Sequence, residues 1–259
     1  MMKVLQLGLL ILLSVWPLSS WSFTLGSLST TQQGWNTKVL TFKVNYSGCS
    51  ISNDRLNTAI DTAINLWNKV ATSGVRLERG GETGTTVAQG LAYNAPDPPV
   101  ILCDTNFTAN FKPGDVNFAN VVLAVTLPKT TNDQMSNAAL ILNSESGKSG
   151  SIETKSDILL SIVLAHEMGH VLGLGHTSDT SALMYFSASL KTELGLSQDD
   201  IDGISYLYPR NELGGAPVFG CGIIDTPENG RNSSLGFGVF LVFLVIAWVI
   251  TRKYRYGIL

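Results

Sequence analysis

Apolar and polar residues alternate along the segment TKVLTFKVNYS, residues 37–47. The apolar residues on one face are Leu40, Phe42, Val44 and Tyr46. A period of two residues predicts a half-buried β-strand. Other short apolar runs, bounded by turn-forming residues, predict more strands. They are expected at residues 75–79, 100–104, 120–128 and 137–144.

In three longer segments the apolar residues recur at helical spacing instead. These segments are residues 52–70, 156–173 and 197–209. Each begins with a serine that can cap the first turn, and in the third Asp200 is placed to complete a capping box. Gly173 and Pro209 are residue types that end helices, and each stands at the end of such a segment.

The two ends of the chain have a different pattern. Residues 1–22 combine a lysine, a leucine-rich run and small residues, which is typical of a secretory signal peptide, with an N-terminal anchor as the alternative. Residues 235–251 are uncharged and can nearly span a hydrocarbon core of about 30 Å. The basic tail, residues 252–259, favours the cytoplasmic side. We therefore expect an exported domain at 23–210, joined to a membrane segment by a linker at 211–234.

Charge and cysteine content narrow the picture further. The formal net charge is −3 and there is no basic stripe, so nucleic acid is not an expected partner. Cys49 and Cys103 lie in the middle region, and Cys221 lies in the linker. Export to an oxidising compartment predicts a Cys49–Cys103 disulfide, and two unpaired buried thiols are the alternative.

The three histidines of the chain all lie in the motif HEMGHVLGLGH. His166 and His170 are four residues apart and therefore share one face of a helix. Gly173 allows a tight turn after which His176 can approach the same point. Three imidazoles and one open position are typical of a catalytic zinc site. Glu167 is then placed to act as the general base for a zinc-activated water.

This motif is the HExxHxxGxxH signature of the metzincin metalloproteases, and within that clan the chain resembles the matrixin family. The segment SALMYF offers Met184 for the methionine turn of metzincins. ALMYF is similar to the matrixin sequence ALMYP, with Phe186 in place of proline. LSQDDIDGISYLYP resembles the terminal helix of matrixins. The resemblance covers about residues 34–209 and is specific over residues 157–209.

The resemblance implies an α+β fold in which a twisted, mixed but mostly parallel five-stranded sheet carries about three helices. It implies a zinc-dependent endopeptidase that hydrolyses proteins outside the cell or in the cell envelope. Met184 is expected to pack beneath the zinc ligands. Tyr185 is expected to line the S1′ side, the alternative being an ordinary packed tyrosine. We expect one zinc ion, because no histidine remains for a second, whereas calcium ions, common in the family, cannot be assigned to ligands.

The ends of the chain depart from animal matrixins. No prodomain and no PRCGxPD-like cysteine switch are recognised, which favours a bacterial type. The segment GCGIIDTP, the apolar run and the basic end resemble bacterial C-terminal sorting tails, in which a processing enzyme would act near Cys221 or the thiol would be lipidated. A simple single-pass anchor with one spare thiol is the alternative.

A second functional class is an inactive, zinc-binding surface module that recognises proteins without cutting them. The presence of Glu167 favours the enzyme, because a module that only binds has no need of a general base.

Overall fold

The computed structural model describes residues 23–26 and 31–210 of the chain. The predicted signal peptide, linker, membrane segment and basic tail lie outside these residues, and so does Cys221. Among the described residues, no helix is both long enough and apolar enough to cross a membrane.

Six strands form one sheet in the order β1-β6-β4-β2-β3, and β5 pairs with β6 outside this path. The strands are β1 (Gln33–Trp35), β2 (Val39–Val44), β3 (Arg76–Glu82), β4 (Val100–Asp104), β5 (Ala124–Thr131) and β6 (Gln134–Asn143). Every pairing is parallel except that of β5 with β6. The mixed, mostly parallel sheet is therefore confirmed, with the short β1 added to the five expected strands.

Strands β4 and β6 are buried on both faces, which explains their continuous apolar runs. Ile101 and Leu140 enter the main core, whereas Leu102 and Ile141, their neighbours in sequence, enter a second cluster on the opposite face. In β2 the predicted alternation holds, because Leu40, Phe42 and Val44 are buried in the main core.

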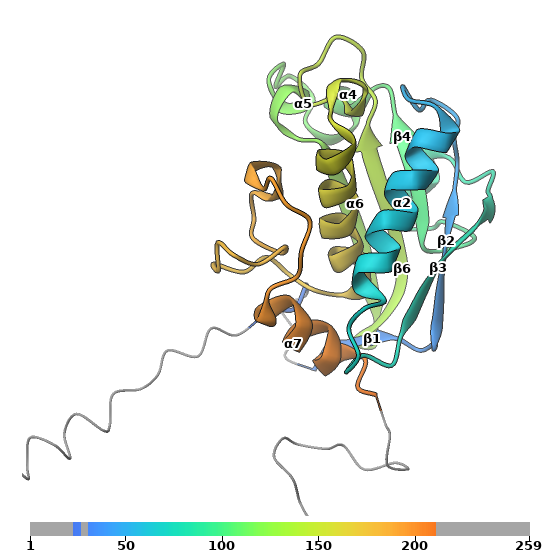
Figure 1. The fold of residues 1–259 in the computed structure, drawn as a ribbon. Helices are drawn as coiled ribbons and strands as arrows, with labels where there is room; N and C mark the ends of the chain where they lie inside the picture. Colours follow the sequence, from blue (N-terminus) through green and yellow to red (C-terminus); the bar gives the residue numbers. More distant parts are fainter. Residues whose placement is uncertain (1–22, 27–30, 211–259) are drawn as a thin grey trace, which may run out of the picture. The chain divides into compact units, whose positions relative to one another are not determined.

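Two long helices lie side by side on one face of the sheet, α2 (Asn53–Trp67) and α6 (Asp157–Leu172) (Figure 1). The indole nitrogen of Trp67 donates a hydrogen bond to the carbonyl of Ala165 at 2.9 Å and so links them. A third helix, α7 (Gln198–Leu207), ends in Tyr208, whose hydroxyl donates to the Leu172 carbonyl at the end of α6. All three begin at the predicted serine caps.

Short helices occupy segments that were expected to be loops or a strand. They are α3 (Val87–Leu91), α4 (Phe107–Phe111), α5 (Phe118–Val121) and the 3-10 turns η1 (Ile152–Thr154) and η2 (Ala188–Leu190). The first three cover the second apolar cluster.

The strand predicted at 120–128 is wrong at its start, because α5 occupies residues 118–121 and β5 begins at Ala124. The amide of Asn143 donates to the carbonyls of Ala119 and Val122, and these contacts across the sheet hold the end of α5. Between the predicted strands 120–128 and 137–144, both strands extend further than predicted, to Thr131 and from Gln134, and a tight hairpin turn joins them. Its residues, Asn132 and Asp133, both have positive φ, which these side chains tolerate.

The predicted disulfide joins Cys49 to Cys103. Cys49 lies between β2 and α2, and Cys103 lies in β4, 54 residues further along the chain. The bond therefore closes a long loop that contains α2, β3 and α3, and it stabilises the domain against unfolding.

We predict that the double variant Cys49→Ala/Cys103→Ala loses about 2–4 kcal/mol of unfolding free energy, because the unfolded chain regains the freedom that the cross-link removes. Urea unfolding followed by circular dichroism measures this change. Wild-type protein treated with a reductant is the matched control and should unfold like the variant. Equal midpoints for the oxidised and the reduced wild type would contradict the prediction.

Candidate metal centre and active site

The three histidines converge although they come from two different segments. His166 and His170 project from α6, and His176 follows the end of the helix. The Nε2 atom of His176 lies 3.3 Å from that of His166 and 3.1 Å from that of His170. Within residues 23–26 and 31–210, this is the one cluster of three or more His, Cys, Asp or Glu side chains with the spacing of a metal site.

Hydrogen bonds to the backbone fix the ring state of two imidazoles. His166 Nδ1 lies 2.7 Å from the Leu183 carbonyl, and His170 Nδ1 lies 2.8 Å from the Leu174 carbonyl. A carbonyl oxygen only accepts, so each Nδ1 carries the hydrogen and each Nε2 keeps its lone pair. Burial and, to a smaller extent, the nearby His170 lower the pKa of His166 to about 3, so this ring is in its neutral, metal-binding form.

The separation of the donor atoms fits zinc. A tetrahedral site with Zn–N bonds of about 2.05 Å has ligand atoms about 3.3 Å apart. His176 Nε2 has about this spacing from each of the other two Nε2 atoms, and the three ligand atoms all lie within 4.8 Å of one another. Three imidazoles supply three protein ligands, which leaves one position open. His166 is buried, whereas His176 is exposed, so solvent reaches the cluster from the His176 side.

Gly173 ends α6 as predicted, in the left-handed conformation with φ of 106°. The backbone amide of Leu174 donates to the Gly169 carbonyl at 2.9 Å. The backbone amide of Gly173 donates to the carbonyl of His170 at 3.0 Å. This closing turn also brings the Leu174 carbonyl to the imidazole of His170. The same glycine therefore turns the chain and places a partner for one histidine.

Met184 is buried, at 2% exposure, in a turn beneath the histidines. Its sulfur fills the space at Gly169, where any Cβ would overlap with it. The amides of Leu183 and Met184 donate to the two carboxylate oxygens of Asp200 at 2.7 and 3.0 Å. Asp200 is thus the capping residue predicted for α7 and also the anchor of the methionine turn.

Glu167 is buried beside the histidines, with 8% of its surface exposed. Its Oε2 atom accepts a hydrogen bond of 2.6 Å from the Thr126 hydroxyl on β5. Burial raises the pKa of this carboxyl group, while the neighbouring imidazole of His170 and the bond from Thr126 act in the opposite direction.

A small pocket of about 180 Å³ lies next to His166 and Glu167. Its other lining residues are Val121, Val122, Leu123, Ala124, Val163, Phe186, Ser187 and Ser189. Phe186 lines this pocket and Tyr185 does not, although the two rings are in contact, with centroids 4.3 Å apart. The S1′ role predicted for Tyr185 therefore stays a prediction, and Phe186 is the aromatic residue at this pocket.

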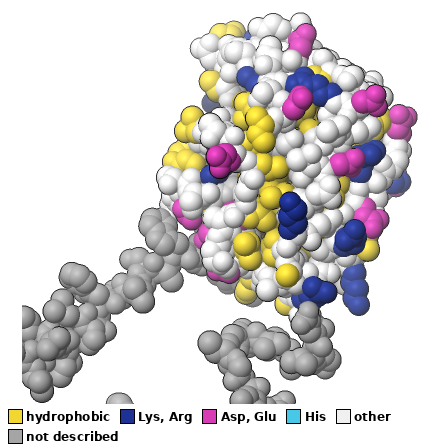
Figure 2. Space-filling view, viewed as in Figure 1, with side chains coloured by type: hydrophobic (Ala, Val, Ile, Leu, Met, Phe, Trp, Pro, Cys, Tyr) yellow, Lys and Arg dark blue, Asp and Glu magenta, His cyan; other side chains and the backbone are white. Residues whose placement is uncertain are grey.

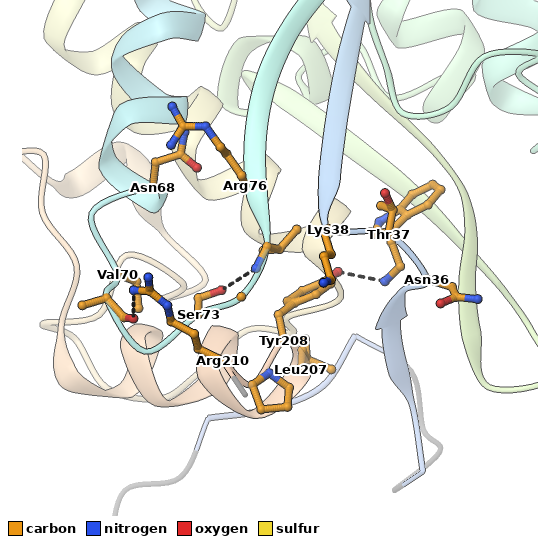
Figure 3. Close-up of a pocket in the computed structure, with 15 residues that line it drawn as sticks. Asn36, Thr37, Lys38, Asn68, Val70, Ser73, Arg76, Leu207, Tyr208 and Arg210 are labelled. Carbon is orange, nitrogen blue, oxygen red and sulfur yellow. Dashed lines mark hydrogen bonds between the residues drawn. The ribbon is translucent and has the colours of Figure 1, made fainter. Parts of the chain in front are cut away.

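A larger pocket of about 850 Å³ lies elsewhere, where the first residues of β2 and β3 meet the end of α7 (Figure 3). Lys38, Arg76 and Tyr208 are among its lining residues, but no histidine and no carboxylate belong to it. On the face shown in Figure 2, acidic and basic side chains are interspersed and no histidine is visible. Neither observation indicates a second catalytic centre.

Four contacts of the site were not predicted. The bonds from Leu183 and Leu174 to the imidazoles are made by backbone carbonyls, which any sequence possesses. Thr126 is one of several threonines in its segment, with no motif around it. Asp200 had a signal, the capping box, but that signal does not reveal that the same carboxylate binds the methionine turn.

The sheet, the helix that carries two of three converging imidazoles, and the buried methionine turn beneath them define a metzincin-type domain. Residues 105–209 match the family model of the matrixins. The described domain is a matrixin-like metzincin.

Individual relatives agree with this family. The chain is 50% identical to interstitial collagenase of Bos taurus over 56 residues, which are 22% of the chain and 12% of that protein. It is 55% identical to metalloendoproteinase 1 of Glycine max over 53 residues, 20% of the chain and 17% of the relative. It is 29% identical to matrix metalloproteinase-20 of Homo sapiens over 193 residues, 71% of the chain and 34% of the relative. The chain thus spans much less than two thirds of these relatives.

We predict that Asp200→Asn weakens zinc binding by about 10- to 100-fold, because the turn that presents the Leu183 carbonyl to His166 loses a charged acceptor. Competition with a zinc chelator of known affinity measures the change. Asp202→Asn is the matched control, because Asp202 is an exposed carboxylate on the same helix. Equal zinc affinities of the two variants would show that Asp200 does not support the site.

Proposed function

We propose that the protein is a zinc-dependent endopeptidase. The observation that supports this most strongly is the convergence of three Nε2 atoms next to the buried carboxylate of Glu167. A binding module would need the imidazoles alone. A buried acid beside an open metal position is the arrangement that hydrolysis needs.

Zinc held by His166, His170 and His176 supplies a Lewis acid that polarises a carbonyl and makes a water molecule acidic near neutral pH. The other chemical steps fall to the chain itself. Glu167 takes the proton of the attacking water, and the same carboxyl group then delivers it to the nitrogen of the leaving amine. Its burial excludes bulk water, which would otherwise compete for this proton.

The surroundings of Glu167 favour an extended peptide as substrate. Among the described strands, β5 pairs only with β6, so one of its edges is unpaired. A peptide can add to such an edge as a further strand. Because β5 begins at the small pocket and contacts Glu167 through Thr126, a peptide bond bound there lies near the base. The pocket is lined by both apolar and polar side chains and can receive one side chain next to that bond.

Export is part of the proposal. The Cys49–Cys103 disulfide supports an oxidising compartment, which agrees with the signal peptide predicted at residues 1–22. The membrane segment and the sorting motif lie outside the described residues and remain predictions. A peptidase acts on proteins or peptides, so the proposal includes substrates of this class and names no individual protein.

We predict that Glu167→Ala abolishes peptide cleavage and keeps the zinc, because the base is lost while all three imidazoles remain. The expected fall in kcat is about 100-fold or more, the usual contribution of general base catalysis. Cleavage of an unfolded protein, followed by electrophoresis and by metal analysis of the same samples, measures both properties. Glu153→Ala, at an exposed site in η1, should cleave like wild type.

Wild-type protein that binds one zinc ion and cuts nothing would instead support the inactive recognition module. Cleavage by Glu167→Ala at the wild-type rate would show that another group is the base.

We predict that His176→Ala reduces the zinc content of the purified protein from one ion per chain to well below one, because only two imidazoles remain. The same sample should lose peptidase activity. Metal analysis after dialysis against a weak chelator measures the content. An unchanged zinc content would exclude His176 as a ligand.

A further inference from the structure

We propose that Thr126 is a positioning residue for Glu167. Its hydroxyl group holds one carboxylate oxygen, Oε2, so that the other oxygen, Oε1, is kept in place to meet the attacking water. This inference rests on the proposed peptidase function. It adds a residue that the histidine motif does not contain and that lies 41 positions earlier in the chain.

The geometry identifies the carboxylate as the main acceptor. Thr126 Oγ1 lies 2.6 Å from Glu167 Oε2 and 3.1 Å from the backbone oxygen of Glu167. The shorter distance is in the range of a hydrogen bond to a charged oxygen, about 2.5–2.7 Å. A hydroxyl group has one hydrogen to donate. Within α6 the backbone oxygen of Glu167 already has a helical partner, so the proton of Thr126 belongs to the side chain.

The hydroxyl group is held independently of the helix that carries Glu167. Thr126 lies in β5, where it pairs with Leu140 of β6. The register of this hairpin fixes the position of Thr126 along the strand. Threonine is branched at Cβ, which restricts its χ1 rotation. Its side chain is half-buried against α6. The donor is therefore ordered by the sheet before any substrate binds.

Glu167 depends on this one contact. A glutamate has three side-chain torsions, and a general base must stay within hydrogen-bond reach of its proton. In the part of the chain that the structure describes, Thr126 is the one hydrogen-bond donor to this carboxylate. The imidazoles are held separately, by carbonyls of Leu183 and Leu174. Loss of the Thr126 hydroxyl should therefore disturb the base and leave the metal ligands in place.

The test compares kcat, KM and zinc content of the full chain carrying Thr126→Val or Thr126→Ser. Valine has nearly the shape of threonine and no donor, whereas serine keeps the donor. We expect kcat of Thr126→Val to fall about tenfold, the effect of losing one hydrogen bond to a charged group. KM and zinc content should not change, because Thr126 lies outside the histidine motif and its hydroxyl group bonds to Glu167 and to none of the three histidines. Thr126→Ser should retain kcat within about twofold of wild type.

Thr58→Val is the matched control for the chemical change, because Thr58 is exposed on α2 and its hydroxyl group bonds only within that helix. If Thr126→Val does not fold, Thr126→Ser and Thr126→Ala form a second pair that also differs by the hydroxyl group. Serine should again keep kcat and alanine should lose it.

Three results would overturn the proposal while leaving the peptidase function intact. They are an unchanged or increased kcat in the variants without a hydroxyl group, an equal loss in Thr126→Ser, and a loss explained by reduced zinc content. Failure of the proposed function is a separate outcome, because then wild type itself does not cleave peptide.

Discussion

A glycine in the left-handed conformation, Gly173, turns the chain at the end of α6 so that His176 returns towards the two imidazoles that the helix carries. A side chain here would be strained and would lie 2.5 Å from the amide nitrogen of Gln32. The helix carbonyls that this turn exposes all find donors from distant segments. The pairs are Val171 with the Trp35 indole, Leu172 with the Tyr208 hydroxyl, and Gly173 with the Gln32 amide. Both ends of the domain therefore close on one helix terminus.

This construction places groups together that would not stay together without a compensating charge. The Nε2 lone pairs of His166 and His170 lie 3.3 and 3.1 Å from Nε2 of His176, and burial disfavours the charged form of Glu167. A bound cation would attract these lone pairs and stabilise the carboxylate, and the neutral form of His166 is the form that binds it. The site is thus ordered for a metal by hydrogen bonds from the surrounding fold, and metal binding adds to the stability of the folded state.

Much of this arrangement can be predicted from sequence patterns. The parts that cannot be predicted depend on contacts between residues that are distant in the sequence. Helical periodicity and serine caps predict α2, α6 and α7, and the spacing of the histidines predicts their cluster. The predicted start of the strand at 120–128 was wrong. The side chain of Asn143, at the end of β6, donates to the carbonyls of Ala119 and Val122 and so holds the helix α5 in this place. Local patterns cannot contain such contacts. The second role of Asp200 was missed for the same reason, since the turn that it binds lies 16 and 17 residues away.

Strand β5 connects the chemistry of the site with the binding of a substrate. Its first residue, Ala124, lines the small pocket, its unpaired edge can accept an extended peptide, and the hydroxyl group of Thr126, two residues further on, donates to the carboxylate of Glu167. An edge strand has bonds on one side only, and a peptide paired to the other side would order it further. Binding of the peptide would thereby also steady the hydroxyl group that positions the base. In the proposed peptidase, the same strand would orient both the bond to be cleaved and the group that takes the proton of the attacking water.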